Sequence, residues 1–318
     1  MLSYAVKRIL WIVPVLLAVS IITFTVMHAA PGSPWNREGR QLNPDLVARL
    51  NEELGLDKPL PFQYLAWVGS VVRGDFGIST STTLNPVNDV IGEVMWPSFQ
   101  LWGMALVLAI VIGVPLGIVA ALRHRTAVDW LATGVAMLGM AMPAFALGAF
   151  LQLWLGAPFY DLSRTPFPAA GWGGPEYWVL PTLAMAGLPM AQIARHTKAS
   201  MLEVTHADYV RTAHSKGLAE RRIVGFHMFR NALVPLVTIA GPLLGVLITA
   251  SIVVERVFDI PGMGSLYWVA LRQRDYSVVM ALTVIFATAV VLMNAIVDLA
   301  YGIIDPRIRD GEYADAHV

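Results

Sequence analysis

Residues 94–122 read VMWPSFQLWGMALVLAIVIGVPLGIVAAL, a run of 29 residues without a single Asp, Glu, Lys or Arg. A helix needs about 20 mostly apolar residues to cross the hydrocarbon layer of a membrane. Inside lipid the backbone must satisfy its own hydrogen bonds, and the α-helix does so within one segment. This run therefore predicts a transmembrane helix.

Five further runs of the chain are also free of charge, at 9–36, 130–160, 177–194, 231–254 and 276–297. The chain has 318 residues, of which 56% are hydrophobic and 14% are charged. All 22 basic and 22 acidic residues fall between the runs, at the density of an ordinary water-exposed surface. We therefore predict an all-α integral membrane protein. Its six transmembrane helices are expected at about 9–30, 98–122, 130–155, 177–197, 231–254 and 277–302.

Basic residues are divided unequally between the segments that connect these helices. With the amino terminus inside, the inner segments 1–8, 123–129, 195–230 and 298–318 hold 13 Lys and Arg, against 9 in the longer outer segments. The positive-inside rule then predicts that both termini are cytoplasmic. The amino-terminal run could also be a secretory signal, but its apolar part is longer than the 7–15 residues usual for a signal core.

Several kinds of chemistry have no support in the sequence. There is no cysteine, and none of the four lysines follows a glycine, as the lysine of a phosphate-binding loop does. The histidines of the inner loop lack the spacing of a helical metal pair. The six runs hold no Asp, Glu, Lys or Arg, and ion-coupled carriers usually have such residues within their spans. Asp298 is either a helix-end residue or a proton relay. No catalytic, metal or cofactor site is expected, and no nucleic-acid partner.

The outer segment 37–93 is too patterned to be a simple connection. Asn43-Pro44-Asp45 is typical of a helix start, Leu46, Leu50 and Leu54 would share a face, and Gly55 would end the helix. A second apolar stretch covers 62–71, after Pro59 and Pro61. Two interpretations stay open: a pair of helices on the outer membrane surface, or a docking surface for an outer partner.

The inner segment 195–230 is the longest basic connection. We predict a helix in which Leu202, Tyr209 and Ala213 share one face while Arg211 and Lys216 stand off it. Gly217 would end that helix before a second one that begins near Ala219. The simpler alternative is a basic patch that touches anionic lipid, although such a patch would not need an ordered apolar face.

Pro and Gly interrupt the predicted spans at Gly113-Val114-Pro115, Met142-Pro143, Gly187-Leu188-Pro189 and Gly241-Pro242. Such breaks are tolerated where neighbouring helices cover the freed backbone groups. They indicate a packed bundle or a path through it, without deciding between the two.

The inner loop contains the motif Ala207-Asp208-Tyr209-Val210-Arg211-Thr212-Ala213-His214-Ser215-Lys216-Gly217-Leu218, followed by Arg230-Asn231-Ala232-Leu233-Val234-Pro235. Further motifs are Lys7-Arg8 with Pro14, and the segments 30–34, 54–59, 74–79, 255–264 and 305–309. Together, and in this order along the whole chain, they resemble the first permease of dipeptide and oligopeptide ABC importers. The general importer motif begins with Glu-Ala-Ala, where this chain has Arg211-Thr212-Ala213. The distance from Gly217 to Pro235 is also longer than in that motif.

The resemblance implies a type I ABC importer permease fold, with residues 1–318 as a single transmembrane domain in a bacterial or archaeal plasma membrane. It implies an external segment 31–97 and a cytoplasmic coupling loop 198–230. The residues expected to contact an ATPase subunit are Ala207, Asp208, Tyr209, Arg211, Thr212, Ala213, Lys216 and Gly217. The expected partners are a second permease, two ATPase subunits that bind ATP and Mg²⁺, and an external substrate-binding protein.

The function that the resemblance implies is import of di- or oligopeptides, driven by ATP hydrolysis in the partner subunits. Relatives of this group also carry nickel complexes, glutathione and some oligosaccharides, so these substrates remain alternatives. Two further classes are a channel or ion-coupled carrier that works alone, and an intramembrane enzyme. The enzyme would need a cluster of acids, bases or metal ligands inside the spans, and the sequence has none.

Overall fold

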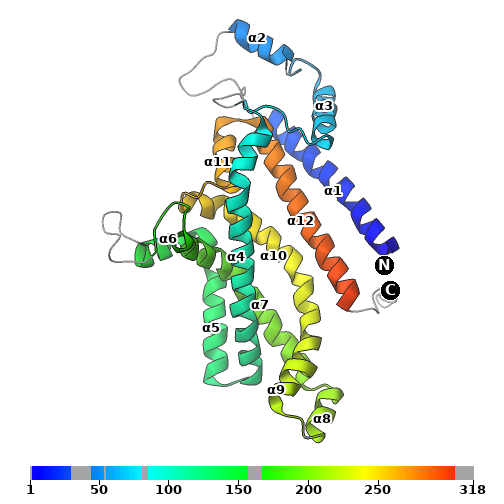
Figure 1. The fold of residues 1–318 in the computed structure, drawn as a ribbon, viewed down its shortest axis with the longest axis vertical. Coiled ribbons are helices and arrows are strands. Elements are labelled where there is room, and N and C mark those ends of the chain that lie inside the picture. The colour runs from blue at the N-terminus through cyan, green and yellow to red at the C-terminus, as the bar shows by residue number, and fades with distance from the viewer. Residues whose placement is uncertain (1, 30–43, 54, 81–84, 157–166, 305–318) are drawn as a thin grey trace. The chain divides into compact units, whose positions relative to one another are not determined.

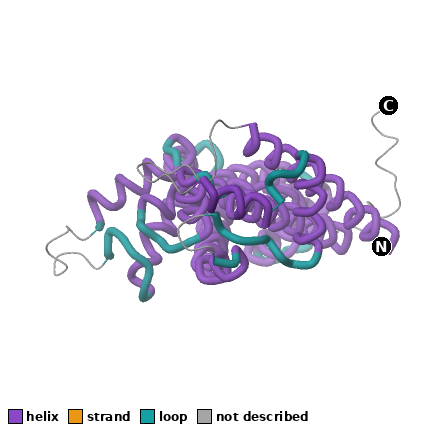
Figure 2. The backbone as a smooth tube through the Cα atoms, turned by 90° about the horizontal axis from the view of Figure 1, so that it is seen from above, coloured by secondary structure: helices purple, strands orange, loops and turns teal. Residues whose placement is uncertain are grey.

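The computed structural model describes residues 2–29, 44–53, 55–80, 85–156 and 167–304. Within these ranges every regular element is a helix, apart from two isolated bridges that join Ile78 to Pro86 and Gly156 to Phe167 (Figures 1 and 2). The helices are α1 (Leu2–Ala29), α2 (Pro44–Glu53), α3 (Leu60–Val72), α4 (Val87–Leu122), α5 (Ala127–Ala141), α6 (Ala144–Leu155), α7 (Pro175–Thr205), α8 (Asp208–Ser215), α9 (Glu220–Arg222), the π-helical turn η1 (Ile223–Met228), α10 (Phe229–Val257), α11 (Met263–Gln273) and α12 (Tyr276–Ile304). The all-α class is therefore confirmed for the described residues.

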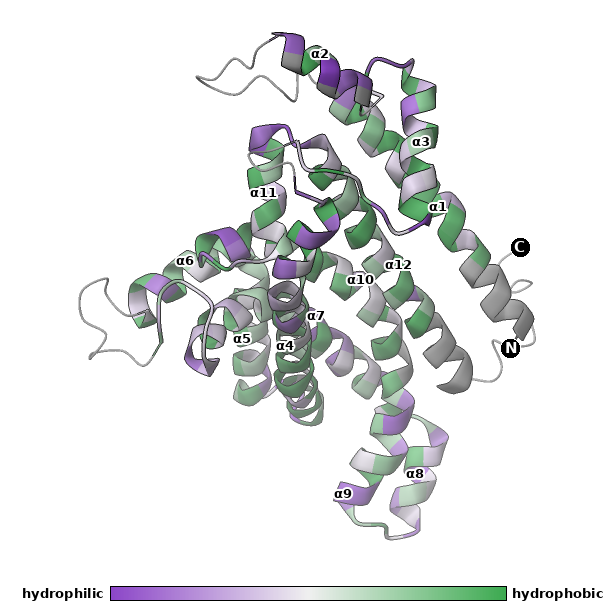
Figure 3. Cartoon of the chain, turned by 45° about the horizontal axis from the view of Figure 1, so that its top comes forward, coloured by the Kyte–Doolittle hydropathy of each residue, from purple (hydrophilic) through white to green (hydrophobic). Residues whose placement is uncertain are grey.

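Four stretches of these helices are long and apolar enough to cross a membrane: Leu10–Ala29, Val87–Leu122, Leu236–Val257 and Tyr276–Val297. The pair α5 and α6 adds a fifth if both helices belong to one span. Figure 3 shows hydrophobic residues along the long helices and hydrophilic ones on α2 and α9. Large side chains on the long helices are exposed, and soluble proteins rarely leave apolar patches of such extent open. These surfaces suit lipid or other membrane helices.

The fourth predicted span lies in α7, which is continuous through Pro181 and Pro189 and extends to Thr205. It does not belong to the four most apolar stretches. Its length nevertheless exceeds what a membrane requires, because a helix rises about 1.5 Å per residue. The first residues of the segment predicted as a coupling loop at 198–230 are therefore helical and belong to α7, which ends at Thr205.

The predicted interruption at Met142-Pro143 is a sharp break, because α5 and α6 meet there at 106°. Met142 is extended, with φ −106° and ψ 126°, as expected for a residue that precedes proline. The side-chain amide of Gln152 on α6 donates to the carbonyls of Ala169 (2.6 Å) and Val257 (2.9 Å). These bonds hold α6 against the end of α10.

The helices group into two compact units, the first formed by residues 1–9, 99–260 and 290–318. In this unit α7 packs against α5, α6 and α10. Small residues allow close approach: a Cβ at Gly117 on α4 would lie 2.5 Å from the Ala194 carbonyl oxygen, and one at Gly139 on α5 would lie 2.5 Å from that of Gly187. Membrane helices commonly associate through such small residues.

The second unit comprises residues 10–98 and 261–289. Ser20 on α1 and Tyr64 on α3 share a hydrogen bond of 2.8 Å between their hydroxyl groups, and the ring of Phe24 lies edge-on to that of Tyr64. The Ser98 hydroxyl accepts a hydrogen bond of 2.8 Å from the backbone N–H of Met263 at the start of α11. Both helices predicted in the outer segment, α2 and α3, are present.

Some predictions lie outside the described residues. These are the motif segments 30–34 and 305–309, the part of the external segment at 31–43, and Leu54. The side chains of Leu46, Leu50 and Asp298 also belong to this group, so the predicted face of α2 and the role of Asp298 stay predictions.

Candidate functional site

The central motif forms α8, a separate eight-residue helix between two turns. Ala207 is extended (φ −69°, ψ 144°) and separates α8 from α7. Asp208 stands in the first turn, where a negative charge interacts favourably with the helix dipole. Gly217 adopts φ +69°, and its N–H donates to the His214 carbonyl at 2.9 Å. A left-handed glycine is a common helix end, so the predicted stop at Gly217 is confirmed.

One face of α8 is buried in an apolar cluster, which we call the α8 cluster. Val210 and Ala213 are 2% and 4% exposed and supply the contribution of α8. The other buried members are Ala121 of α4, Met201 of α7, Ile223 and Met228 of η1, and Ala232 of α10. Burying these side chains fixes α8 to the ends of three long helices (Figure 1).

The opposite face of α8 is polar and exposed. It carries Asp208, Tyr209, Arg211 and Thr212, and Lys216 follows at the end of the helix. Asp208 and Arg211 form an exposed ion pair at 3.6 Å, and the Thr212 hydroxyl donates to the Asp208 carbonyl at 2.9 Å. The eight predicted residues thus gather on one short helix and its flanks.

The predicted face of this helix is wrong in its details. Leu202 belongs to α7 and reaches the α8 cluster from there, while Tyr209 is 41% exposed. The chain turns at His206-Ala207, which resets the helical phase, so Val210 rather than Tyr209 joins Ala213 inside. The predicted second helix begins at Glu220, and η1 carries it without a gap into α10.

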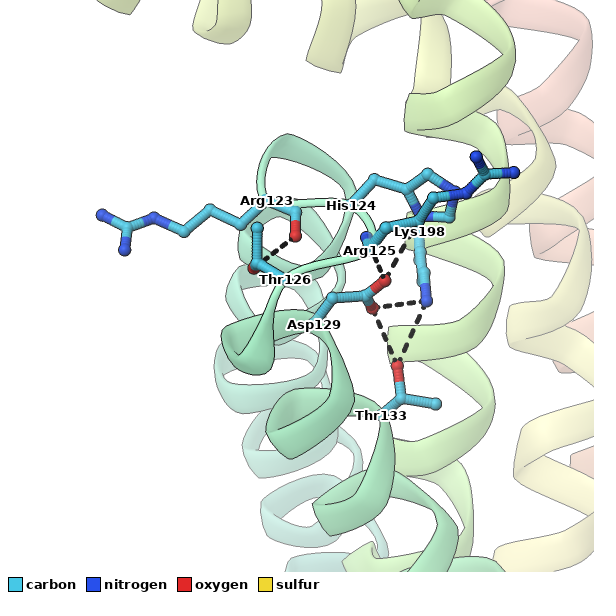
Figure 4. Close-up of polar contacts among 7 residues, drawn as sticks. All are labelled: Arg123, His124, Arg125, Thr126, Asp129, Thr133 and Lys198. Carbon is cyan, nitrogen blue, oxygen red and sulfur yellow. Dashed lines mark hydrogen bonds and ion pairs between the residues drawn. The ribbon is translucent and has the colours of Figure 1, made fainter.

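A second polar group, which the sequence does not predict, lies at the start of α5. Asp129 is 6% exposed. One carboxylate oxygen accepts from Lys198 Nζ of α7 at 2.5 Å and from the Thr133 hydroxyl at 3.1 Å. The other accepts from the backbone N–H of Arg125 at 3.0 Å and lies 3.2 Å from His124 Nδ1 (Figure 4).

We call this group the Asp129 network. It joins the α4–α5 turn, the first turns of α5 and the later part of α7. Arg125 adopts φ +63°, which points its N–H at the carboxylate, whereas the Arg123 side chain points away (Figure 4). Only the spacing of Asp129 and Thr133, one helical turn apart, could have been noticed in advance. Lys198 is 69 residues away.

Neither group has the composition of a reaction centre. Among the described residues, no three His, Asp or Glu side chains come together in a way that could hold a metal ion. The α8 surface offers charges and hydroxyls to a partner, and the Asp129 network offers a mechanical link between helices. An all-helical bundle with apolar outer surfaces and a short polar helix beyond its long helices defines a multi-pass membrane protein.

Comparisons with known proteins give the family. The profile described as "Binding-protein-dependent transport system inner membrane component" matches residues 113–310, and the profile of the corresponding N-terminal region matches residues 1–88. The chain therefore belongs to the family of inner-membrane components of binding-protein-dependent transport systems, and it is a multi-pass inner-membrane protein.

Relatives along the whole chain agree with this result. The dipeptide transport system permease protein DppB of Bacillus subtilis is 40% identical over 97% of this chain and 98% of its own length. The oligopeptide permease OppB of Haemophilus influenzae is 38% identical, over 97% of this chain and all of its own. The glutathione permease GsiC of Shigella flexneri is 36% identical, over 97% and 99%.

The fold also resembles a solved structure. Inward-facing conformations of the MetNI methionine ABC transporter match with a TM-score of 0.57 at 16% identity, over 68% of this chain and 96% of that chain. At this identity the likeness concerns the fold alone, which is that of an ABC importer permease.

Proposed function

We propose that this chain is the permease subunit of an ATP-driven importer of di- or oligopeptides. It would form the translocation path with a second, homologous permease. ATP hydrolysis would take place in two cytoplasmic ATPase subunits, and an external binding protein would deliver the substrate. The observation that carries this proposal is the polar face of α8, exposed on a helix whose other face is anchored in the bundle.

The contact with an ATPase subunit would be made by α8 and its flanks. The buried face with Val210 and Ala213 makes α8 a rigid extension of α4, α7 and α10. The exposed face presents Asp208, Arg211 and Lys216, which suit a polar partner surface. Closure of the ATPase pair would then displace α8 and shift the bundle between its two open states.

The topology that fits this role has six spans and both termini in the cytoplasm. The apolar stretches in α1, α4, α10 and α12, the α5–α6 pair and α7 would supply the spans. The family resemblance and the excess of basic residues in 195–230 support a cytoplasmic coupling loop at 198–230, an external segment at 31–97, and one transmembrane domain over 1–318.

A peptide substrate is supported by the names of the relatives, which are dipeptide, oligopeptide and glutathione permeases. Uptake of labelled di- and tripeptides would be measured in cells with and without the chain. We expect ATP-dependent uptake that competing peptides abolish. Loss of nickel, glutathione or oligosaccharide uptake alone would instead assign one of the alternative substrates. Ion-driven flux through the purified chain would contradict the importer.

The ATPase contact can be tested by cross-linking, because this chain contributes no cysteine of its own. Thr212→Cys places a thiol on the exposed face of α8, and Arg73→Cys places one after α3 as a control. In the assembled complex, a bifunctional reagent should join position 212 to an ATPase subunit and leave position 73 unjoined. Failure of position 212 to cross-link in an intact complex would exclude the proposed contact.

A further inference from the structure

The α8 cluster connects α8 to some helices of the first unit more directly than to others. Its buried members come from α4, α7, α8, η1 and α10. Among the described residues, the cluster contains no member of α5. A displacement of α8 would therefore pass through apolar contacts to α4, α7 and α10. It would reach α5 through the short turn that follows α4 and through the contacts of α5 with α7.

The Asp129 network reinforces both of these connections, because Asp129 bonds to the turn at Arg125 and to α7 at Lys198. Lys198 and Met201 lie three residues apart on α7, so the stretch of helix that contributes Met201 to the α8 cluster also carries the lysine. Lys198 Nζ reaches Asp129 at 2.5 Å and the Thr133 hydroxyl at 3.2 Å. A continuous path of contacts thus runs from Ala213 and Val210 through α7 to the first turns of α5.

The remaining contacts of α5 with α7 are made by small apolar residues and lie beside a cavity. Ala136 packs on Ala191 and Ala194, and Gly139 lies against the Gly187 backbone. Near the polar network, a cavity of about 460 Å³ is lined by residues of α4, α5 and α7, and Thr133 and Lys198 are among them. These small side chains make no directional bond, and the described hydrogen bonds between α5 and α7 are those of Lys198 with Asp129 and Thr133.

The other end of α5 is a break at which the helix direction changes. α5 ends at Met142-Pro143, where α6 leaves at 106°, and α6 is held by the two hydrogen bonds of Gln152. α5 can therefore turn as a unit about Met142-Pro143, because a few residues at the end of a helix can absorb such a change of direction.

From this arrangement we propose that Asp129 and Lys198 are a positioning pair that makes α5 follow the movement of α8. The inference rests on the proposed function, because it assumes that an ATPase subunit displaces α8. The pair touches no substrate; it acts by keeping the register of α5 on α7. Breaking it leaves the α8 cluster intact and releases α5 from the coupled movement.

The chemistry of a buried ion pair gives a way to separate this role from simple stability. Removing one partner leaves an uncompensated buried charge, which is strongly destabilising, whereas replacing both charges by neutral groups is much better tolerated. The variants are Asp129→Asn, Lys198→Met and the two combined. Lys198→Arg keeps the charge, and Arg195→Gln, an exposed residue on the same helix, is the matched control.

Solute imported per ATP hydrolysed would be measured for the complete importer in vesicles. We expect the double variant to assemble in near-native yield while its uptake per ATP falls by roughly fivefold or more. Lys198→Arg and Arg195→Gln should retain native coupling. Native uptake per ATP in the double variant would overturn the proposal, because the pair would then be a structural contact only.

Distances between spin labels test the movement itself. One label at Thr212→Cys on α8 is combined with a second at Leu131→Cys on α5, which is 70% exposed. In the native background this distance should be the same without nucleotide and in the ATP-trapped state. In the double variant it should differ between the two states, and a constant distance there would refute the proposed link.

A third label position provides the control. Leu122→Cys, at the end of α4 beside the buried Ala121, should keep its distance to Thr212→Cys in every variant, because the α8 cluster joins them. Failure of the ATPase contact would be seen separately, as a lack of cross-linking at position 212. The two hypotheses can therefore fail independently.

Discussion

Ser79 and Asp275, 196 positions apart in the sequence, share a hydrogen bond of 2.5 Å between the serine hydroxyl and the carboxylate. Asp275 is 1% exposed and also accepts from the Thr80 N–H and from the N–H of Val278 in the first turn of α12. The residue therefore caps α12 and fixes the segment that precedes α4. The predicted motif at 74–79 thus includes a structural contact.

Replacing Asp275 by alanine should weaken this corner of the second unit. The variant loses a charged acceptor to which several buried groups donate, which costs about 1.5–3 kcal/mol in the free energy of unfolding. Ser79→Ala removes one donor and should cost about 1 kcal/mol. Unfolding of the purified chain in detergent would measure both, and equal losses would contradict the central role of Asp275.

Close helix contact in the first unit depends on Gly117. A Cβ there would lie 2.5 Å from both the Ala194 carbonyl oxygen and the Thr197 Cβ, so Gly117→Ala forces α4 away from α7. We expect a loss of about 1–3 kcal/mol, typical of overpacking. Gly103→Ala on the same helix is the control, since nothing lies within 4 Å of its added methyl group. A similar stability for both variants would show that the contact is unimportant.

Two substitutions at Gly217 distinguish the effect of its backbone conformation from the effect of charge on the neighbouring surface. Its φ of +69° disfavours most side chains, but asparagine and aspartate tolerate this region. A side chain there would point into open space. Gly217→Asn should therefore keep both fold and ATPase coupling, whereas Gly217→Asp adds a charge beside the proposed docking face and should uncouple ATP hydrolysis from uptake. Unchanged uptake and coupling in assembled Gly217→Asp would count against that face.

The exposed ion pair of Asp208 and Arg211 gives a related prediction. At 3.6 Å and with both side chains largely exposed, it should contribute less than about 1 kcal/mol to stability. Arg211→Gln should then have the same free energy of unfolding as the native chain. It should nevertheless bind the ATPase subunit less tightly than the native chain does. Co-purification of the ATPase with the tagged chain measures this binding. A large loss of stability would mean that Arg211 has a structural role.

The sequence could predict those features that depend on local composition. Long charge-free runs locate the apolar helices. Gly217 marks a break because glycine can adopt a left-handed backbone that most residues avoid, and Pro143 marks one because proline fixes its own φ and has no N–H to donate. The phase of α8 was missed because it depends on where the chain turns, at His206-Ala207, and a change of one residue exchanges Tyr209 for Val210. The pairs Asp129–Lys198 and Ser79–Asp275 join distant segments, and no local pattern reports such contacts.

α6 follows the break at Met142-Pro143 and carries Gln152 on its third turn. The Gln152 amide donates to two carbonyls outside its own helix, those of Ala169 and Val257, and so adds directional bonds to the packing of α6 on α7 and α10. Gln152→Leu keeps the size of the side chain but leaves both carbonyls without this donor, and should cost about 1–3 kcal/mol. Phe150→Leu, at a half-exposed site on α6, is the control and should cost less. If α6 guides the turning of α5, Gln152→Leu should also lower solute uptake per ATP in vesicles. A native ratio in a destabilised variant would limit Gln152 to a structural role.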